Sequence, residues 1–147
     1  MKLVVAADHG GRAAKESLRA ELEARGYEVL DEGTHDDVSC DYPDYAARVA
    51  ARVAAGEARF GVLVCGTGIG MAVSANKHKG VRAAVVADAF SAAMCRAHND
   101  ANVICFGARL LADAAMLRLL LIFLETDFEG GRHARRVAKM GRLELEL

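Results

Sequence analysis

Short apolar runs alternate along this chain with longer segments in which apolar residues recur every three or four positions. The short runs are typical of buried strands and predict strands over residues 2–7, 27–30, 60–64, 81–87 and 103–106. The longer segments are typical of amphipathic helices and predict helices over residues 12–25, 42–55, 71–76, 91–97, 112–124 and 132–140. Gly26 and Gly56 follow the first two helices, where a glycine commonly ends a helix.

The alternation of strands and helices predicts an α/β fold, a Rossmann-like three-layer αβα sandwich. We expect a five-stranded parallel sheet in the order 2-1-3-4-5, additional C-terminal helices, and one domain spanning residues 1–147. Ligands of such sheets bind at the carboxyl ends of the strands, near the switch between the first and third strands. Asp8 and His9 end the first strand and residues 65–70 follow the third, so the two segments should meet in one crevice.

The predicted helix over residues 112–124 is apolar on nearly every side. A helix of this kind must be buried on more than one side, which favours a homo-oligomeric interface. The alternative is a monomer in which the C-terminal helix covers it.

Charge and composition narrow the classes of function. The chain has 19 Lys and Arg residues against 20 Asp and Glu residues, a net charge of −1, so it has no general attraction to nucleic acid or anionic membranes. The apolar stretch at the start of the chain is too short for a signal peptide and is followed too soon by an acidic residue. The longest apolar region, 110–124, is interrupted by charges and is shorter than a membrane span. The four cysteines have no CxxC spacing, which favours a cytoplasmic protein with free thiols and disfavours a structural metal site.

The strongest candidate for chemistry is the glycine-rich loop over residues 66–70, which follows Cys65 at the end of the third strand. Its backbone N–H groups, together with the start of the next helix, are suited to hold an anion. A cysteine at the mouth of that site is favoured as a reactive thiolate, whereas a small buried hydrophobic residue is the ordinary alternative. The loop also partly matches the GxGxxG dinucleotide fingerprint, although Met71 takes the position of the third glycine.

Further polar residues lie near the ends of other elements. His98 and Asn99 precede the fifth strand, and Arg109 follows it. Arg132 and Arg136 are four residues apart and share one helix face, so they can hold a phosphate together, although such a basic run is usually a solvated face.

Several segments, taken together and in order, resemble ribose-5-phosphate isomerase type B and its wider family, which includes the subunits of galactose-6-phosphate isomerase. The resemblance covers about residues 2–140 and rests on the motifs Asp8-His9-Gly10-Gly11, Asp41-Tyr42-Pro43, Cys65-Gly66-Thr67-Gly68-Ile69-Gly70, Ala75-Asn76-Lys77, His98-Asn99-Asp100 and Glu129-Gly130-Gly131-Arg132-His133.

This resemblance implies that Cys65 is the catalytic base, that His98 opens the sugar ring, and that Thr67 belongs to the catalytic loop. A second branch of the family uses a glutamate a few residues further on, but residues 71–75 contain no carboxylate here. The resemblance implies that the loop amides hold the enediolate oxygen and that the two helix arginines bind phosphate. The implied substrate contacts are Asp8, His9, Gly66, Gly68, Ile69, Gly70, Asn99, Arg109, Arg132 and Arg136.

The activity implied by the resemblance is reversible isomerisation of ribose 5-phosphate to ribulose 5-phosphate, a step of the pentose phosphate pathway. It implies no metal and no organic cofactor, and a homodimer or dimer of dimers whose active sites are shared across the interface. Galactose 6-phosphate, allose 6-phosphate and four-carbon sugar phosphates are alternative substrates. A non-catalytic nucleotide-binding domain and a regulatory sugar-phosphate sensor are alternatives from other classes.

Overall fold

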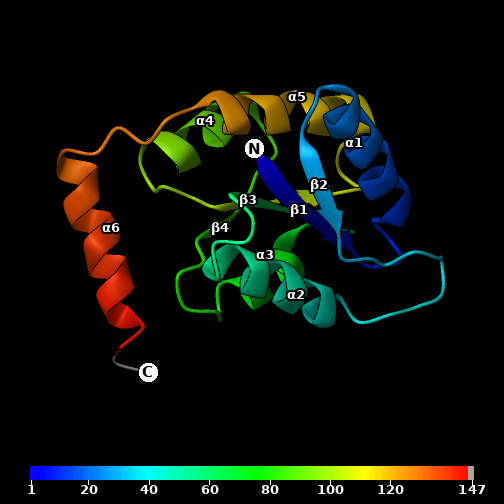
Figure 1. Cartoon of the computed structure of the whole chain (residues 1–147), viewed down its shortest axis with the longest axis horizontal. Coiled ribbons are helices and arrows are strands. Elements are labelled where there is room, and N and C mark those ends of the chain that lie inside the picture. The colour runs from blue at the N-terminus through cyan, green and yellow to red at the C-terminus, as the bar shows by residue number, and fades with distance from the viewer. Residues whose placement is uncertain (146–147) are drawn as a thin grey trace.

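The computed structural model describes residues 1–145 and has the predicted αβα layers (Figure 1). Its strands are β1 (Lys2–Ala7), β2 (Glu28–Asp31), β3 (Phe60–Cys65), β4 (Ala83–Val85) and β5 (Val103–Gly107). Its helices are α1 (Arg12–Ala24), α2 (Tyr42–Ala54), α3 (Ile69–Ala75), α4 (Ala89–Ala97), α5 (Asp113–Glu125) and α6 (Arg132–Leu143). The last two residues of the predicted single domain lie outside the described part.

All strand pairs are parallel, and the sheet has the order β2-β1-β3-β5-β4. The α/β prediction is confirmed, but the predicted order 2-1-3-4-5 is wrong for the last two strands. The reason is burial: every residue of β5 is buried, whereas β4 has only three residues and none of them is buried. A fully apolar strand is stabilised most between two neighbours and two helical layers, so β5 takes the interior and β4 the edge.

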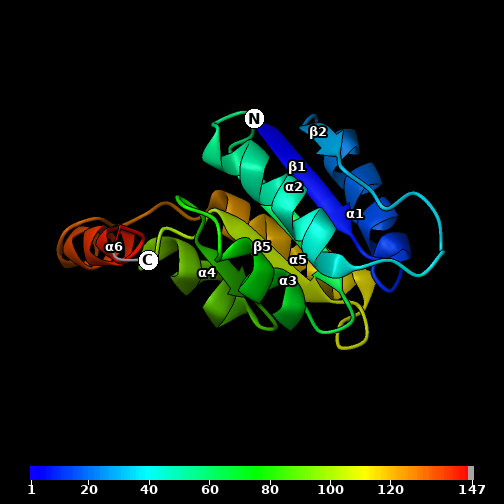
Figure 2. The ribbon, with the colours of Figure 1, turned by 90° about the horizontal axis from the view of Figure 1, so that it is seen from below.

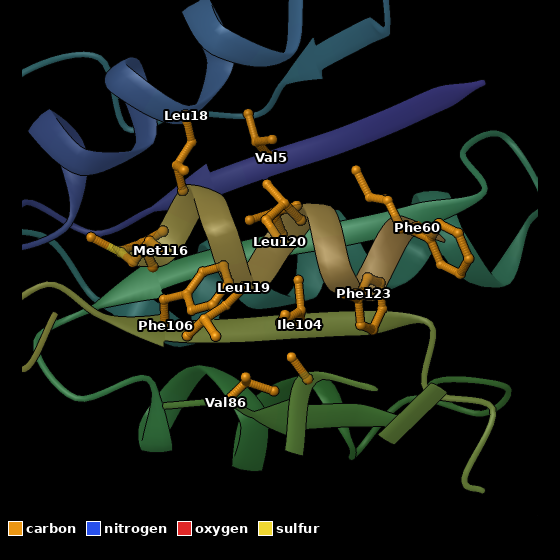
Figure 3. Close-up of a cluster of buried hydrophobic side chains, with 14 of the residues drawn as sticks. Val5, Leu18, Phe60, Val86, Ile104, Phe106, Met116, Leu119, Leu120 and Phe123 are labelled. Carbon is orange, nitrogen blue, oxygen red and sulfur yellow. The ribbon is translucent and has the colours of Figure 1, made fainter. Parts of the chain in front are cut away.

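Two apolar cores cover the two faces of the sheet. Figure 1 shows the helices that lie on either side of it. Helices α1, α4 and α5 pack on one face and α2 and α3 on the other. In the first core, Phe60 of β3 meets Phe123 of α5 edge to face, with ring centroids 5.1 Å apart (Figure 3). The guanidinium of Arg96 lies over both rings, at 4.7 and 5.7 Å from their centroids, and closes that end of the core.

The apolar helix α5 is buried on more than one side, as its sequence predicts. Met116, Leu119, Leu120 and Phe123 face the sheet core (Figure 3), while α1 and α4 flank the helix within the same chain. Leu117 and Ile122 are only partly buried and pack against the same core. The sheet and neighbouring helices of the same chain therefore cover most of the apolar surface of α5, and α5 by itself no longer argues for an oligomer.

Helix α6 stands apart from the sandwich in both views (Figures 1 and 2). Of its residues, His133 alone is buried. Just beyond the helix, Glu144 accepts a hydrogen bond from the Gly80 amide at 2.8 Å, which ties the far end of α6 back to the body. None of the helices within residues 1–145 is both long enough and apolar enough to span a membrane.

Candidate active site

A cleft of about 540 Å³ opens at the carboxyl ends of β1, β3 and β5. The two segments that the sequence predicts to meet do so here, because β1 and β3 are paired neighbours. The cleft is lined by Asp8, His9, Gly10, Tyr42, Cys65, Gly66, Thr67, Ile69, Gly70, Val73 and Arg109. The predicted crevice at the switch between the first and third strands is therefore confirmed.

Cys65 is the last residue of β3, and only 5% of its surface is exposed. The Gly68 amide donates a hydrogen bond to the sulfur at 3.1 Å. Gly68 has a φ of +81°, and a Cβ added there would lie 2.9 Å from the Phe106 carbonyl carbon, so the position requires glycine. The turn thus aims a backbone donor at the sulfur, and such a donor stabilises a thiolate more than a thiol.

The other thiols are less suited to reaction. Burial raises the pKa of Cys95 to about 11 and raises that of Cys105 further still, so both thiols remain protonated at neutral pH. Cys40 is partly exposed and lies near His9 rather than near the glycine loop. Among the four cysteines, Cys65 alone lies at the loop and receives a backbone hydrogen bond on its sulfur.

Asp8 and His9 are held by short polar contacts. One carboxylate oxygen of Asp8, a residue only 8% exposed, accepts hydrogen bonds from the Gly10 and Gly11 amides at 3.0 and 3.1 Å. The Cys40 amide donates to Nδ1 of His9 at 3.2 Å, so the neutral ring carries its proton on Nε2. Nε2–H of His9, a residue that lines the cleft, is therefore a hydrogen-bond donor.

Arg109 reaches the cleft because β5, not β4, lies next to β3. Its backbone N–H donates to the Gly66 carbonyl at 3.0 Å, and the Ala108 N–H donates to the Cys65 carbonyl at 2.8 Å. With the predicted order 2-1-3-4-5, β4 would have separated Arg109 from the glycine loop. The corrected strand order therefore places a cation beside Cys65.

Sequence reasoning did not assign a role to Tyr42 or Val73, although both line the cleft. A Cβ added to Gly70 would lie 2.6 Å from the Tyr42 ring, so ring and loop are in direct contact. The signal for Tyr42 was its place in the Asp41-Tyr42-Pro43 motif. For Val73 the sequence holds no signal beyond its position in the helix after the loop.

His98, Asn99, Arg132 and Arg136 do not line this cleft. His98 caps the C-terminal end of α4, and its ring stacks on that of His133 with centroids 4.1 Å apart. Asn99 lines a separate groove of about 480 Å³ beside the end of α6, and both arginines lie on α6. Figure 1 shows α6 at the left edge, on the side of the sheet away from the end of β1.

The His98 side chain lies against one imidazole and near one carboxylate. Its Nε2 is 3.7 Å from Oε2 of Glu129, and Nε2 of His133 is 3.5 Å from the same oxygen. Burial, followed by the charges of His98 and Arg132, lowers the pKa of His133 below its ordinary value. The chain therefore carries two separate groups of candidate residues, at the carboxyl edge of the sheet and at the junction of α4 with α6.

Comparison with known proteins assigns the chain to a family. The family model described as Ribose/Galactose Isomerase matches residues 3–140. Ribose-5-phosphate isomerase B of Escherichia coli is 41% identical over 143 residues, which cover 97% of this chain and 96% of that protein.

Solved structures are equally similar. A ribose-5-phosphate isomerase B from Clostridium thermocellum superposes with a TM-score of 0.98 at 44% identity, covering 99% of each chain. The enzyme from Mycoplasma genitalium with bound ribulose-5-phosphate superposes with a TM-score of 0.95 at 39% identity, covering 99% of this chain and 97% of that one. This chain belongs to the ribose/galactose isomerase family.

Proposed function

We propose that this protein is an aldose–ketose isomerase that interconverts ribose 5-phosphate and ribulose 5-phosphate. The observation that carries the proposal is the Cys65 sulfur, hydrogen-bonded to the Gly68 amide in a cleft shared with Asp8 and His9. The sequence and structural similarity to ribose-5-phosphate isomerases B supports the substrate. The Mycoplasma genitalium relative binds ribulose-5-phosphate.

The proposed reaction begins when His98 passes a proton to the ring oxygen of the cyclic sugar and the bond from that oxygen to C1 breaks. The anomeric hydroxyl loses its proton to water as it becomes the C1 carbonyl, with Asp8 orienting the substrate. Cys65, as thiolate, removes the proton from C2 and forms an enediolate. The hydroxyl proton of O2 then moves to O1, and the resulting thiol returns a proton to C1, which leaves the ketone at C2. Because the Gly68 amide already donates to the sulfur, other donors of the loop stabilise the enediolate oxygen. Each well-placed donor contributes roughly 3 kcal/mol to such a transition state.

We propose that the working unit is a homodimer, or a dimer of dimers, in which α6 and the end of α4 complete the cleft of the partner subunit. Within residues 1–145, the cleft that holds Cys65 lacks His98, Arg132 and Arg136, the groups proposed for ring opening and phosphate binding. Ile69 and Val73 stand beside the cleft with 57% and 55% of their surfaces exposed, as expected for an interface. Arg132 and Arg136 would then hold the phosphate, and Thr67, Arg109 and Asn99 would contact the sugar.

Activity on ribose 5-phosphate, measured by a coupled assay, tests the reaction. Cys65→Ala should nearly abolish turnover while substrate binding and the thermal midpoint are largely retained. Cys95→Ala is the matched control, because that buried thiol remains protonated and should not affect turnover. Near-normal activity of Cys65→Ala would remove this residue as the base.

Mixing two inactive variants tests the shared site. In a dimer of one Cys65→Ala subunit and one His98→Asn subunit, one site is intact only if each cleft takes its histidine from the partner. Random reassociation should then restore about a quarter of wild-type activity, because half of the dimers are mixed and each has one good site. If all groups came from one chain, every site would keep a defect and no activity would return.

Other phosphorylated sugars test the breadth of the site. The family description includes galactose isomerases, so galactose 6-phosphate, allose 6-phosphate and a four-carbon sugar phosphate belong in the same assay panel. A thermal-shift comparison with NAD separates the isomerase from a nucleotide-binding domain. Exchange of the C2 proton with solvent separates it from a sensor that binds without turnover.

We also propose that the protein works in the cytoplasm, in the pentose phosphate pathway. All four cysteines are free, and a thiol base works best where thiols are kept reduced. Fractionation of the producing cells and pentose accumulation in a deletion strain would test these two assignments.

A further inference from the structure

Three side chains with metal-binding atoms converge where α4 meets the start of α6. Nε2 of His98 and Nε2 of His133 both face Oε2 of Glu129, and the three atoms lie within 4.8 Å of one another. Two imidazoles and one carboxylate form a ligand set that zinc commonly takes in proteins, with a fourth position left for water.

The spacing of these atoms is close to that of a tetrahedral site. With metal–ligand bonds of about 2.0–2.1 Å, neighbouring ligand atoms in such a site lie about 3.4 Å apart. The two histidine nitrogens lie 3.7 and 3.5 Å from the carboxylate oxygen. A shift of a few tenths of an ångström therefore brings each nitrogen–oxygen pair to the spacing of ligands on one metal ion.

We propose that His98, Glu129 and His133 form a binding site for a divalent transition cation such as Zn²⁺. The cation is an inhibitor of the protein, not a cofactor that its reaction needs.

Binding requires one change in the cluster. The two rings are stacked with their planes only 9° apart, so their lone pairs do not yet converge on one point. His98 is able to turn, because 37% of its side chain is exposed, whereas His133, with 8% exposed, is held in place. The Glu129 backbone is anchored by a hydrogen bond from its N–H to the Ala97 carbonyl at 3.0 Å. The buried His133 is thus the fixed ligand, and the exposed side chains of Glu129 and His98 close on the ion.

The described residues contain one other group of side chains with this kind of spacing. Glu16, Asp31 and His35 form a second cluster with similar spacing among the described residues. There, however, Lys15 and Arg19 already pair with the carboxylates at 2.7 to 3.6 Å. These cations compete with a metal ion, so the second cluster is disfavoured.

The inhibitory effect rests on the proposed function, while metal binding itself does not. A cation on Nε2 of His98 would prevent that nitrogen from passing a proton to the sugar ring oxygen. Isomerisation should therefore fall in proportion to occupancy of the site and recover when a chelator removes the ion.

Titration of the chelator-treated, full-length protein with Co²⁺ tests the site independently of activity. We expect visible absorption bands of tetrahedral Co²⁺, displaced by one equivalent of Zn²⁺ per subunit. Glu129→Gln should weaken Co²⁺ binding at least about tenfold, because loss of a direct ligand costs no less than loss of an outer contact. The matched control, His35→Ala, should leave the affinity unchanged within about twofold.

Two results would overturn the proposal. A strong thiolate-to-cobalt band in the near ultraviolet would show that Cys65 or Cys40 holds the ion instead. Equal affinity in wild type and Glu129→Gln would exclude this carboxylate as a ligand, and Glu129 is exposed enough (55%) for the variant to fold. A protein that binds Co²⁺ as expected but never isomerises ribose 5-phosphate would refute the proposed function and leave the metal site standing.

Discussion

The contact between Gly70 and the Tyr42 ring gives a quantitative test of how the glycine loop is held. In Gly70→Ala, the new methyl carbon would start 2.6 Å from the ring, and ordinary contact begins at 3.4 Å. Either the ring or the loop must therefore move by about 0.8 Å. Tyr42 is 41% exposed, so its ring can partly yield, and the cost in folding free energy should be about 1 kcal/mol, the low end for overpacking.

The cost to catalysis should be larger than the cost to stability. A misplacement of about 1 Å near reacting groups reduces rates about 100-fold, equivalent to about 2.7 kcal/mol of transition-state stabilisation. We therefore expect kcat/KM for ribose 5-phosphate to fall 10- to 100-fold, to order of magnitude, while the thermal midpoint falls by about 3 °C.

A coupled assay and a thermal melt measure the two effects. The double variant Tyr42→Ala/Gly70→Ala should lose much less activity and stability than the sum of the losses in the two single variants, because the clashing ring is gone. Gly141→Ala is the control: apart from its chain neighbours and its own helix backbone, no atom lies within 4 Å of the added Cβ. Activity should be unchanged, and the thermal midpoint should not fall, because alanine favours a helix more than glycine does. Unchanged activity of Gly70→Ala, or no coupling with Tyr42→Ala, would refute the argument that this contact positions the loop.

Three other variants test separate parts of the molecule. Arg136→Ala should raise KM at least about tenfold with little change in kcat if it binds phosphate, whereas the neighbouring Arg135→Ala should not. Arg19 and Lys15 hold the pKa of Glu16 at about 2, below its ordinary 4.5, so this carboxylate stabilises the fold above pH 4.5 and less as pH falls toward 2. Glu16→Gln should flatten the decline of the thermal midpoint across that interval, and an unchanged decline would contradict the ion-pair explanation. Leu119→Ala should cost about 2–5 kcal/mol in urea unfolding because the side chain is 1% exposed, whereas the exposed Val38→Ala should cost less than about 0.5 kcal/mol.

Much of the fold was predictable because each strand carries its own apolar pattern. The order of the last two strands was not predictable, because the sequences of β4 and β5 both look apolar. Their positions depend on which strand buries more apolar surface in the sheet. Arg82 was the available hint: a charged residue within the predicted strand 81–87 is disfavoured in a strand that is buried on both faces. Local patterns identify strands, but competition between strands for the interior decides their order.

The candidate site was predictable only where strand ends bring residues together. Asp8 and the glycine loop follow paired strands, so their meeting followed from topology. Cys40 contacts His9 across 31 positions through an irregular loop, and no periodicity signals such a contact. The stack of His98 on His133 likewise joins segments 35 positions apart, and it depends on how the 126–131 connection turns.

The two outer strands of the sheet, β2 and β4, are its shortest, with four and three residues. Unpaired backbone groups along a long outer strand would invite another sheet to add on and start aggregation. Here each edge strand exposes only a few backbone N–H and C=O groups, so any added strand would form few hydrogen bonds. In the proposed dimer, association of subunits is therefore left to helices and side chains, which recognise one partner, and continuous growth through the backbone is disfavoured.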